Sequence, residues 1–141
     1  MQIEGSKKSI IKKYYRAEFM GAGFYGQLAK SSPDYKISTK VNKVAEDEYR
    51  HGVMFSRFYS KHYGGKSIPS LWLFLGKVAA CMIFFIPFKL KIKVLSSIEE
   101  KATKQVAEAL SRDIDADIAK LLKAITPDEL RHAKLYESIY K

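Results

Sequence analysis

The stretch DEYRHG at residues 47–52 recurs later in the chain as DELRHA at residues 128–133. Both copies place a Glu three residues before a His, and residues at this spacing project from one face of an α-helix. The repeat indicates that the chain contains two related helical halves.

Two further glutamates repeat the same spacing. Glu18 stands 30 residues before Glu48, and Glu99 stands 30 residues before Glu129. The midpoint of the first interval falls in the turn-forming sequence SSPD at residues 31–34. Each Glu would then lie about 15 residues, or roughly 22 Å, from the bend of its hairpin at 1.5 Å per residue. The two glutamates of a hairpin are therefore expected to face each other at one depth.

Apolar residues recur with the period of a helix in four stretches, at residues 8–30, 38–63, 89–112 and 115–136. The chain has no alternating apolar and polar run bounded by hairpin residues, so strands are not expected. We expect an all-α fold in which two helical hairpins form a four-helix bundle. A length of 141 residues suits a single domain over residues 1–141.

The fourth helical stretch carries two local signals. Asp113 and Asp115 are both suited to cap its N-terminus. Thr126, Pro127 and Glu129 match a capping box with Pro at the first helical position, which would start a new helix there. Such a start would leave no helix to bury the apolar residues before Thr126. We therefore expect Pro127 to kink or interrupt one continuous helix.

Each of the four apolar stripes carries a Glu at its centre. Burying a carboxylate without a partner costs about several kcal/mol, so four such residues require a common partner. Docking the hairpins would gather four carboxylates and two imidazoles, the ligand set of a di-iron or di-manganese centre. A single Glu-x-x-His arises often by chance on surface helices, and the prediction depends on the whole set. The predicted ligands are Glu18, Glu48, His51, Glu99, Glu129 and His132.

Neighbouring residues are interpreted by their position on these helices. Glu100 is rotated about one hundred degrees from Glu99, toward the side of the bundle, and is not expected to bind metal. Tyr25 shares the interior face of Glu18, where it either packs in the core or donates to a ligand carboxylate. His62 is expected to sit at a helix end, and Cys81 to be a small buried apolar residue.

Composition limits the remaining possibilities. One Cys excludes an intramolecular disulfide framework and any two-cysteine metal knuckle. The net charge of +10 points to a polyanionic neighbour. The lysines are scattered through every helix and no nucleic-acid motif is present, so nucleic acid is not the expected partner. The N-terminal residues do not match a secretory signal.

An apolar crossover at about residues 66–90 joins the two hairpins, and residues 71–88 form its most apolar part. Lys77 and Pro87 interrupt this part, and a membrane-spanning helix needs roughly 20 apolar residues. The segment could be an interfacial helix, a buried crossover or a short span. Flanking lysines favour an anionic lipid surface as a partner, and the same segment could support a homodimer.

The residues around the predicted ligands resemble those of ferritin-like di-iron carboxylate proteins. They are most similar to the demethoxyubiquinone hydroxylase family of ubiquinone biosynthesis. The resemblance is carried by Glu18, Gly21-Ala22, Phe24-Tyr25, Gly26-Gln27 and Ile98-Glu99-Glu100.

This resemblance implies a ferritin-like bundle that binds two iron ions, or manganese, and acts as a monooxygenase. It implies hydroxylation of a quinone-like lipid substrate, with electrons from a separate donor. The expected location is cytoplasmic and peripheral, on the inner face of a membrane. Two alternatives stay open: a ferroxidase or peroxide-scavenging rubrerythrin-like protein, and a non-enzymatic basic helical protein that binds membranes. The rubredoxin-like Cys pairs usual in rubrerythrins cannot form with one Cys.

Overall fold

The computed structural model describes residues 2–112 and 114–141, and all regular structure among them is helical. This confirms the predicted all-α class. The chain divides into two compact units, the first ending at Phe84 and the second beginning at Phe85. Each unit contains one helical hairpin, as the repeat predicts.

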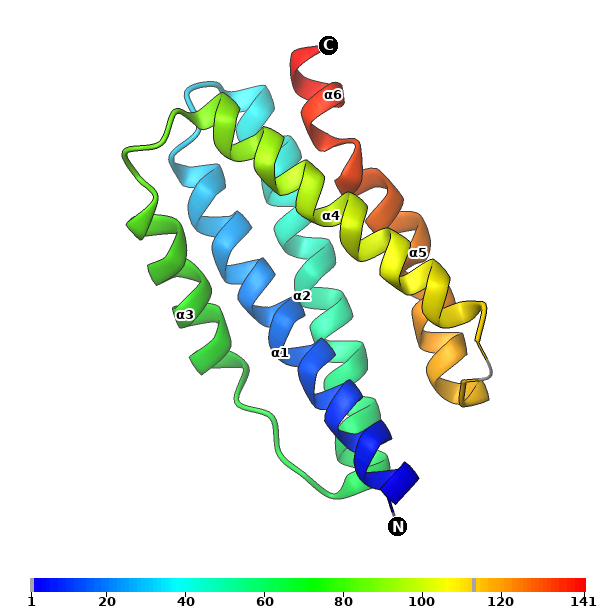
Figure 1. Ribbon diagram of the computed structural model, residues 1–141. Coiled ribbons are helices and arrows are strands. Elements are labelled where there is room, and N and C mark those ends of the chain that lie inside the picture. Colours follow the sequence, from blue (N-terminus) through cyan, green and yellow to red (C-terminus); the bar gives the residue numbers. More distant parts are fainter. Residues whose placement is uncertain (1, 113) are drawn as a thin grey trace. The chain divides into compact units, whose positions relative to one another are not determined.

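The first unit is built on a hairpin of two long helices, α1 (Gln2–Lys30) and α2 (Tyr35–Tyr63), shown in Figure 1. Asp34 caps α2, because its Oδ1 accepts the backbone N–H groups of Lys36 and Ile37 at 2.7 and 3.1 Å. This cap starts α2 three residues before the expected position. At the other end Gly64 adopts a left-handed φ of 67°, which ends the helix after Tyr63, the end expected from the sequence.

The predicted stripes of α1 and α2 form the core of this hairpin. Their apolar members are buried, except that Tyr14 is half-buried. Tyr14 stacks on Phe55 across the hairpin, with ring centroids 5.0 Å apart. The glutamates and the histidine of the two stripes are buried in the same faces.

The crossover forms a third helix, α3 (Pro69–Met82), which packs along α1 (Figure 1). Two glycines allow the backbones to approach closely. A Cβ atom at Gly23 would overlap the carbonyl oxygen of Leu73, and one at Gly76 would overlap that of Met20. The inner face of α3 is therefore a backbone-to-backbone contact.

The outer face of α3 is exposed, and this corrects two expectations. Phe74 and Met82 are 61% and 71% exposed, so a fully buried crossover is not what the structure contains. Cys81 is exposed rather than buried, because only Gly76 and Ala80 of α3 are buried. Among the described residues, none of the helices combines the length and hydropathy required to span a membrane.

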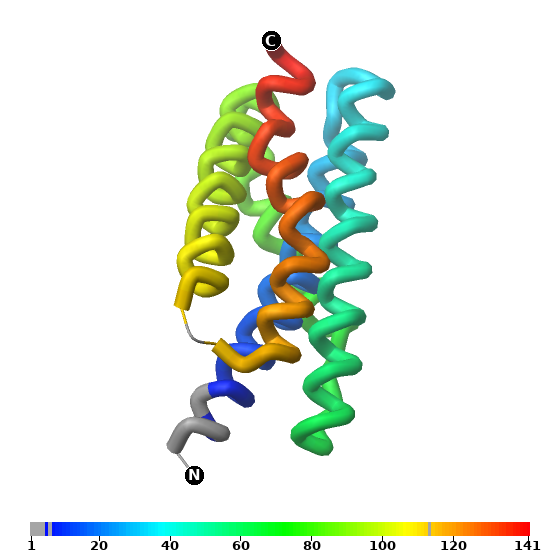
Figure 2. Tube along the Cα trace, turned by 90° about the vertical axis from the view of Figure 1, so that its right-hand side faces the viewer, coloured from blue at the N-terminus to red at the C-terminus, as the bar shows by residue number. Residues whose placement is uncertain are grey.

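The second unit consists of α4 (Phe88–Leu110), α5 (Ala116–Ala133) and the short α6 (Leu135–Tyr140). Figure 2 shows α4 and α5 running side by side in opposite directions, with α6 following α5. Asp115 caps α5 as predicted, accepting the N–H groups of Asp117 and Ile118 at 3.0 and 3.3 Å. The other predicted cap, Asp113, lies outside the described residues.

Helix α5 continues through Pro127, as expected. Thr126 does not cap a new helix, because its Oγ1 donates to the carbonyl of Leu122 at 2.8 Å inside α5. The expected fourth helix nevertheless ends before Tyr136, which lies on α6. The N–H of Tyr136 donates to Ser96 Oγ of α4 at 2.8 Å, and this long-range bond accompanies the break that periodicity did not predict.

The contact between α1 and α3 can be tested with one added methyl group. Gly76→Ala should lower the free energy of unfolding by about 1–3 kcal/mol, because the new atom has no space beside Met20. Gly26→Ala on α1 is the matched control, since its Cβ would only touch Ala45 at 3.9 Å. The control should raise the same free energy by about 0.5–1 kcal/mol. Urea unfolding measures both, and equal effects would contradict the proposed contact.

Candidate metal centre

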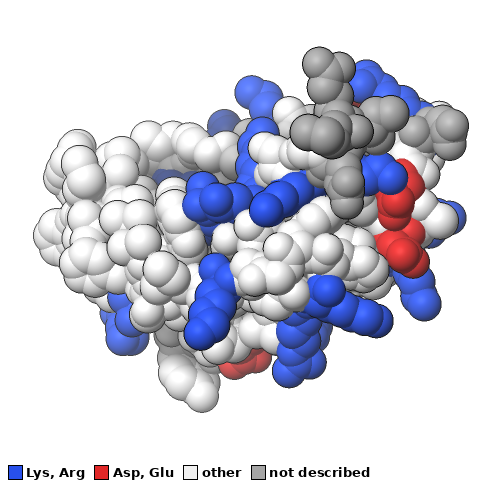
Figure 3. Space-filling view, turned by 90° about the horizontal axis from the view of Figure 1, so that it is seen from below, with Lys and Arg blue, Asp and Glu red and all other residues white. Residues whose placement is uncertain are grey.

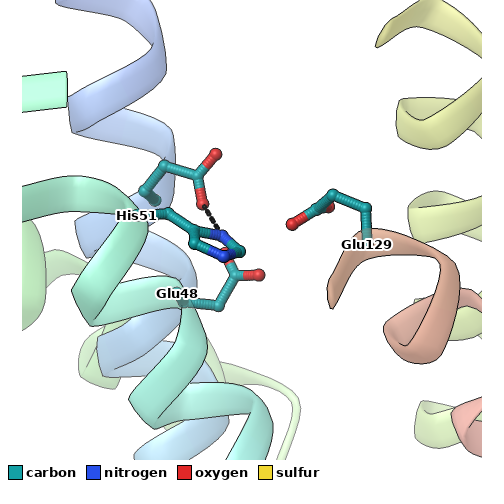
Figure 4. Close-up of side chains that lie close together, drawn as sticks. Glu48, His51 and Glu129 are labelled. Carbon is teal, nitrogen blue, oxygen red and sulfur yellow. Dashed lines mark ion pairs between the residues drawn. The ribbon is translucent and has the colours of Figure 1, made fainter. Parts of the chain in front are cut away.

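The first hairpin brings together three of the six predicted ligands. Glu18 projects from α1, and Glu48 and His51 project from α2. One ligand atom from each lies within 4.8 Å of the others. Figure 4 shows Glu48 and His51 close together. His51 Nδ1 lies 3.4 Å from Glu18 Oε2. We call these three residues the first triad.

The first triad is buried in the hairpin, and Glu48 is only 6% exposed. Next to His51 in the chain, Gly52 leaves room for the buried Phe19 ring, which a Cβ atom at Gly52 would overlap. Two carboxylates at such short range repel each other, and burial removes the water that would screen them. The first triad therefore has the negative charge that a cation would compensate.

Gly21 makes the space for one of these carboxylates. A Cβ atom at this position would lie 2.5 Å from Glu48 Oε2. Any larger residue would push Glu48 away from Glu18 and His51. The sequence showed this Gly only as part of a family pattern, and its role depends on a contact between two helices.

The second unit contains the other three predicted ligands. Glu99 projects from α4, and Glu129 and His132 project from α5. Their ligand atoms also lie within 4.8 Å of one another, and His132 Nδ1 is 3.7 Å from Glu129 Oε1. Glu129, labelled in Figure 4, and His132 are buried, whereas Glu99 is half-buried. These residues form the second triad.

The structure separates Glu99 from its neighbour as expected. Glu100 is exposed and accepts a hydrogen bond from Lys104 Nζ at 2.8 Å. This hydrogen bond and the Lys104 charge lower the pKa of Glu100. Glu100 is therefore bound to a surface lysine, and Glu99 is the residue that joins the second triad.

Two acidic residues next to the triads were not singled out from the sequence. Asp47 is 1% exposed, and its Oδ1 lies 3.0 Å from both Lys43 Nζ and Arg50 Nη2. In the second copy of the repeat, Asp128 pairs with Arg131 at 2.6 Å. The recurrence of Asp and Arg around each Glu was the available signal. These ion pairs neutralise the aspartates beside the ligand positions.

The remaining candidates lie as follows. Tyr25 is buried and its ring makes an edge contact with Phe24 at 6.0 Å. Its action on a ligand carboxylate stays a prediction. His62 lies in the last turn of α2, where it stacks on Phe58 at 4.2 Å and is exposed. This agrees with a helix-end residue.

The donor chemistry of both triads fits a transition metal. Each triad offers two carboxylates and one imidazole, a set that suits iron or manganese and contains no thiolate. The space at Gly21 and the burial of the charged groups are consistent with a bound cation. That these residues bind metal stays a prediction.

Comparison with known proteins gives one match. A family model described as Rubrerythrin matches residues 9–140, which spans both units. This family is part of the ferritin-like di-iron superfamily, so the predicted ferritin-like class is confirmed. The closer resemblance to demethoxyubiquinone hydroxylases is not confirmed. Neither the curated proteins nor the solved structures searched gave a match.

Filling the space at Gly21 should weaken metal binding specifically. Gly21→Ala should lower iron affinity roughly 10–100-fold, the range seen when residues that orient ligands are changed. Helix content should not fall, because Ala favours helices more than Gly does. Iron titration followed by absorbance measures the effect, and Gly26→Ala on the same helix is the control. Unchanged iron affinity in Gly21→Ala would show that Glu48 does not need this space to bind metal.

Proposed function

Because the chain belongs to the Rubrerythrin family, whose members are ferritin-like di-iron proteins, we propose that it is a di-iron oxidoreductase. The oxidant it reduces is dioxygen or hydrogen peroxide. The first triad holds mainly one iron and the second triad mainly the other. The six ligands are Glu18, Glu48, His51, Glu99, Glu129 and His132.

The observation that carries this proposal is the duplication of the triads. Each unit places two carboxylates and one imidazole within 4.8 Å of one another, at equivalent positions of one sequence repeat. Burying carboxylates close to one another is destabilising, and it recurs in both halves. Together the two copies supply the four carboxylates and two imidazoles that a di-iron centre uses.

When bound, a di-iron pair supplies two electrons and open coordination positions for a small oxidant. The protein's own groups hold the pair and isolate it. The carboxylates of Glu18 and Glu48 would offset its positive charge, and the fully buried Phe19 and Phe55 rings make the hairpin around the first triad apolar. A dry pocket protects a reactive oxidant from side reactions.

The electrons come from a separate donor in this proposal. The 141 residues contain one Cys, and Cys81 is exposed on α3. A four-cysteine iron site cannot be assembled from them. Reduction of hydrogen peroxide to two waters takes two electrons and two protons, and a soluble reductant or electron-transfer protein is required after each turnover.

A second candidate reaction is hydroxylation of a membrane-borne quinone precursor, and the surface of α3 favours it. Figure 3 shows an uncharged surface where α3 lies, with Lys and Arg side chains beside it. The exposed apolar side chains along this segment are Ile68, Leu71, Phe74, Leu75, Val78, Met82 and Phe84. We propose that this surface, the α3 face, docks on an anionic lipid bilayer as a peripheral contact. The net charge of +10 and exposed Lys66 and Lys77 complement such a surface.

Adjacent glutamates on α4 test the di-iron proposal. Glu99→Ala should reduce the iron content from two per chain to about one or fewer and lower dioxygen or peroxide reduction by at least about 100-fold. Glu100→Ala should leave both unchanged, since Glu100 is exposed and bound to Lys104. Iron analysis and stopped-flow absorbance after anaerobic Fe(II) loading measure the two properties.

Equal iron content in the two variants would exclude Glu99 as a ligand. Fewer than two metals in the unaltered protein would favour the non-enzymatic alternative. Comparing the rates with dioxygen and with hydrogen peroxide decides which oxidant the centre prefers.

The α3 face is tested by vesicle binding. The double variant Phe74→Ser/Met82→Ser should bind vesicles containing phosphatidylglycerol at least about tenfold more weakly, because burying one large apolar side chain contributes roughly 1.5–3 kcal/mol. Tyr35→Ser is the control, since Tyr35 is 85% exposed and lies outside α3. Cosedimentation with anionic and with neutral phosphatidylcholine vesicles gives the comparison.

Equal binding to both vesicle types, or no change in the double variant, would reject the lipid surface as the partner. If the double variant instead converts a dimer to a monomer in sedimentation, the α3 face is an interface between two copies of this chain.

A further inference from the structure

A line of aromatic rings follows the first hairpin from the triad toward the end of α2. Tyr15 of α1 contacts Tyr59 of α2 edge to face, with ring centroids 5.3 Å apart. Tyr59 in turn lies 5.7 Å from Tyr63, in the last turn of the helix. Tyr15 and Tyr59 are buried, at 3% and 5% exposure, and Tyr63 is half-buried. The line therefore runs from the core toward the surface.

The inner end of this line adjoins the first triad. Tyr15 lies three residues before Glu18 on α1, and Phe55 lies four residues after His51 on α2, so each shares a helix face with a ligand. Tyr14 stacks on Phe55 at 5.0 Å between the two helices. An aromatic layer thus follows directly on the ligand layer.

The residue type at each step is informative. Phe would fill the same volume, yet all three positions of the line carry a phenol, which gives up an electron and a proton far more readily than a benzene ring. Gly65 packs against this line, since a Cβ atom at Gly65 would overlap the Tyr59 ring. Gly65 therefore lets the loop after α2 close directly over Tyr59.

We propose that Tyr15, Tyr59 and Tyr63 form a path that carries electrons from the protein surface to the iron centre. This inference rests on the proposed function. Reduction of dioxygen to two waters requires four electrons and four protons, and two ferrous ions provide only two electrons. The other two come from the external donor. In each transfer Tyr15 loses one electron and its phenolic proton, Tyr59 restores them, Tyr63 restores Tyr59, and the donor restores Tyr63.

The path is tested by omitting the donor, so that oxidised tyrosines accumulate. Protein loaded with two Fe(II) per chain is mixed with dioxygen and a nitroso spin trap, and the adducts are located by peptide mass spectrometry. Tyr63 should be the main labelled residue, with a matching organic radical in the electron paramagnetic resonance spectrum. Tyr59→Phe keeps the ring and removes the phenol, and should reduce labelling of Tyr63 at least tenfold. Tyr15→Phe should have the same effect.

Tyr35 provides the internal control, because it is 85% exposed and lies at the opposite end of α2. A diffusible oxidant would label Tyr35 at least as strongly as Tyr63, and that outcome would overturn the path. Undiminished labelling of Tyr63 in Tyr59→Phe would overturn it as well. If two irons per chain are oxidised normally but Tyr63 is not labelled, the electron path is rejected and the proposed function is not. Fewer than two irons in the unaltered protein rejects the proposed function together with it.

Discussion

The burial of like charges in the first hairpin constrains the rest of that unit. Glu18 and Glu48 face each other inside the contact between α1 and α2, where water cannot screen them. The His51 imidazole lies 3.4 Å from Glu18, and a bound cation would compensate the negative charge of such a layer. Both helices are 29 residues long and place aromatic and aliphatic residues on either side of it. Metal binding and folding stability are thereby linked, since a cation that binds the folded hairpin stabilises it by mass action.

The same constraint divides the acidic residues of the repeat into two roles. In each Asp-Glu pair the Asp is neutralised locally by an Arg three residues later, as in Asp47–Arg50 and Asp128–Arg131. The Glu is buried in the interior, where it joins a triad with a second Glu and a His. Adjacent carboxylates on one helix thus point about one hundred degrees apart. The Asp forms an ion pair with an Arg, whereas the Glu is a predicted metal ligand.

Features set by local periodicity and by the repeat were predictable from the sequence. The hairpins, the buried positions of the predicted ligands and the Asp115 cap all follow from spacing within one helix or one turn. The exposure of Cys81 does not, because it depends on which face of α3 meets α1. Gly23 and Gly76 decide that through contacts with Leu73 and Met20, which lie 50 and 56 residues away in the chain. The break before Tyr136 depends on Ser96, 40 residues away. Contacts between helices, rather than propensities within them, account for these errors.

Helix α1 connects the proposed chemistry to the proposed docking surface. One of its faces carries Glu18 toward α2, and the opposite face, at Met20 and Gly23, meets the backbone of α3. Glycine inside a helix costs about 1 kcal/mol relative to alanine, so two of them within three residues need compensation. The cost of Gly21 is compensated by the space that this residue leaves for Glu48. The cost of Gly23 is compensated by the close approach of α3. A partner bound to the α3 face would then lie one helix away from the ligands, and any displacement of α3 would act directly on the backbone that positions Glu18.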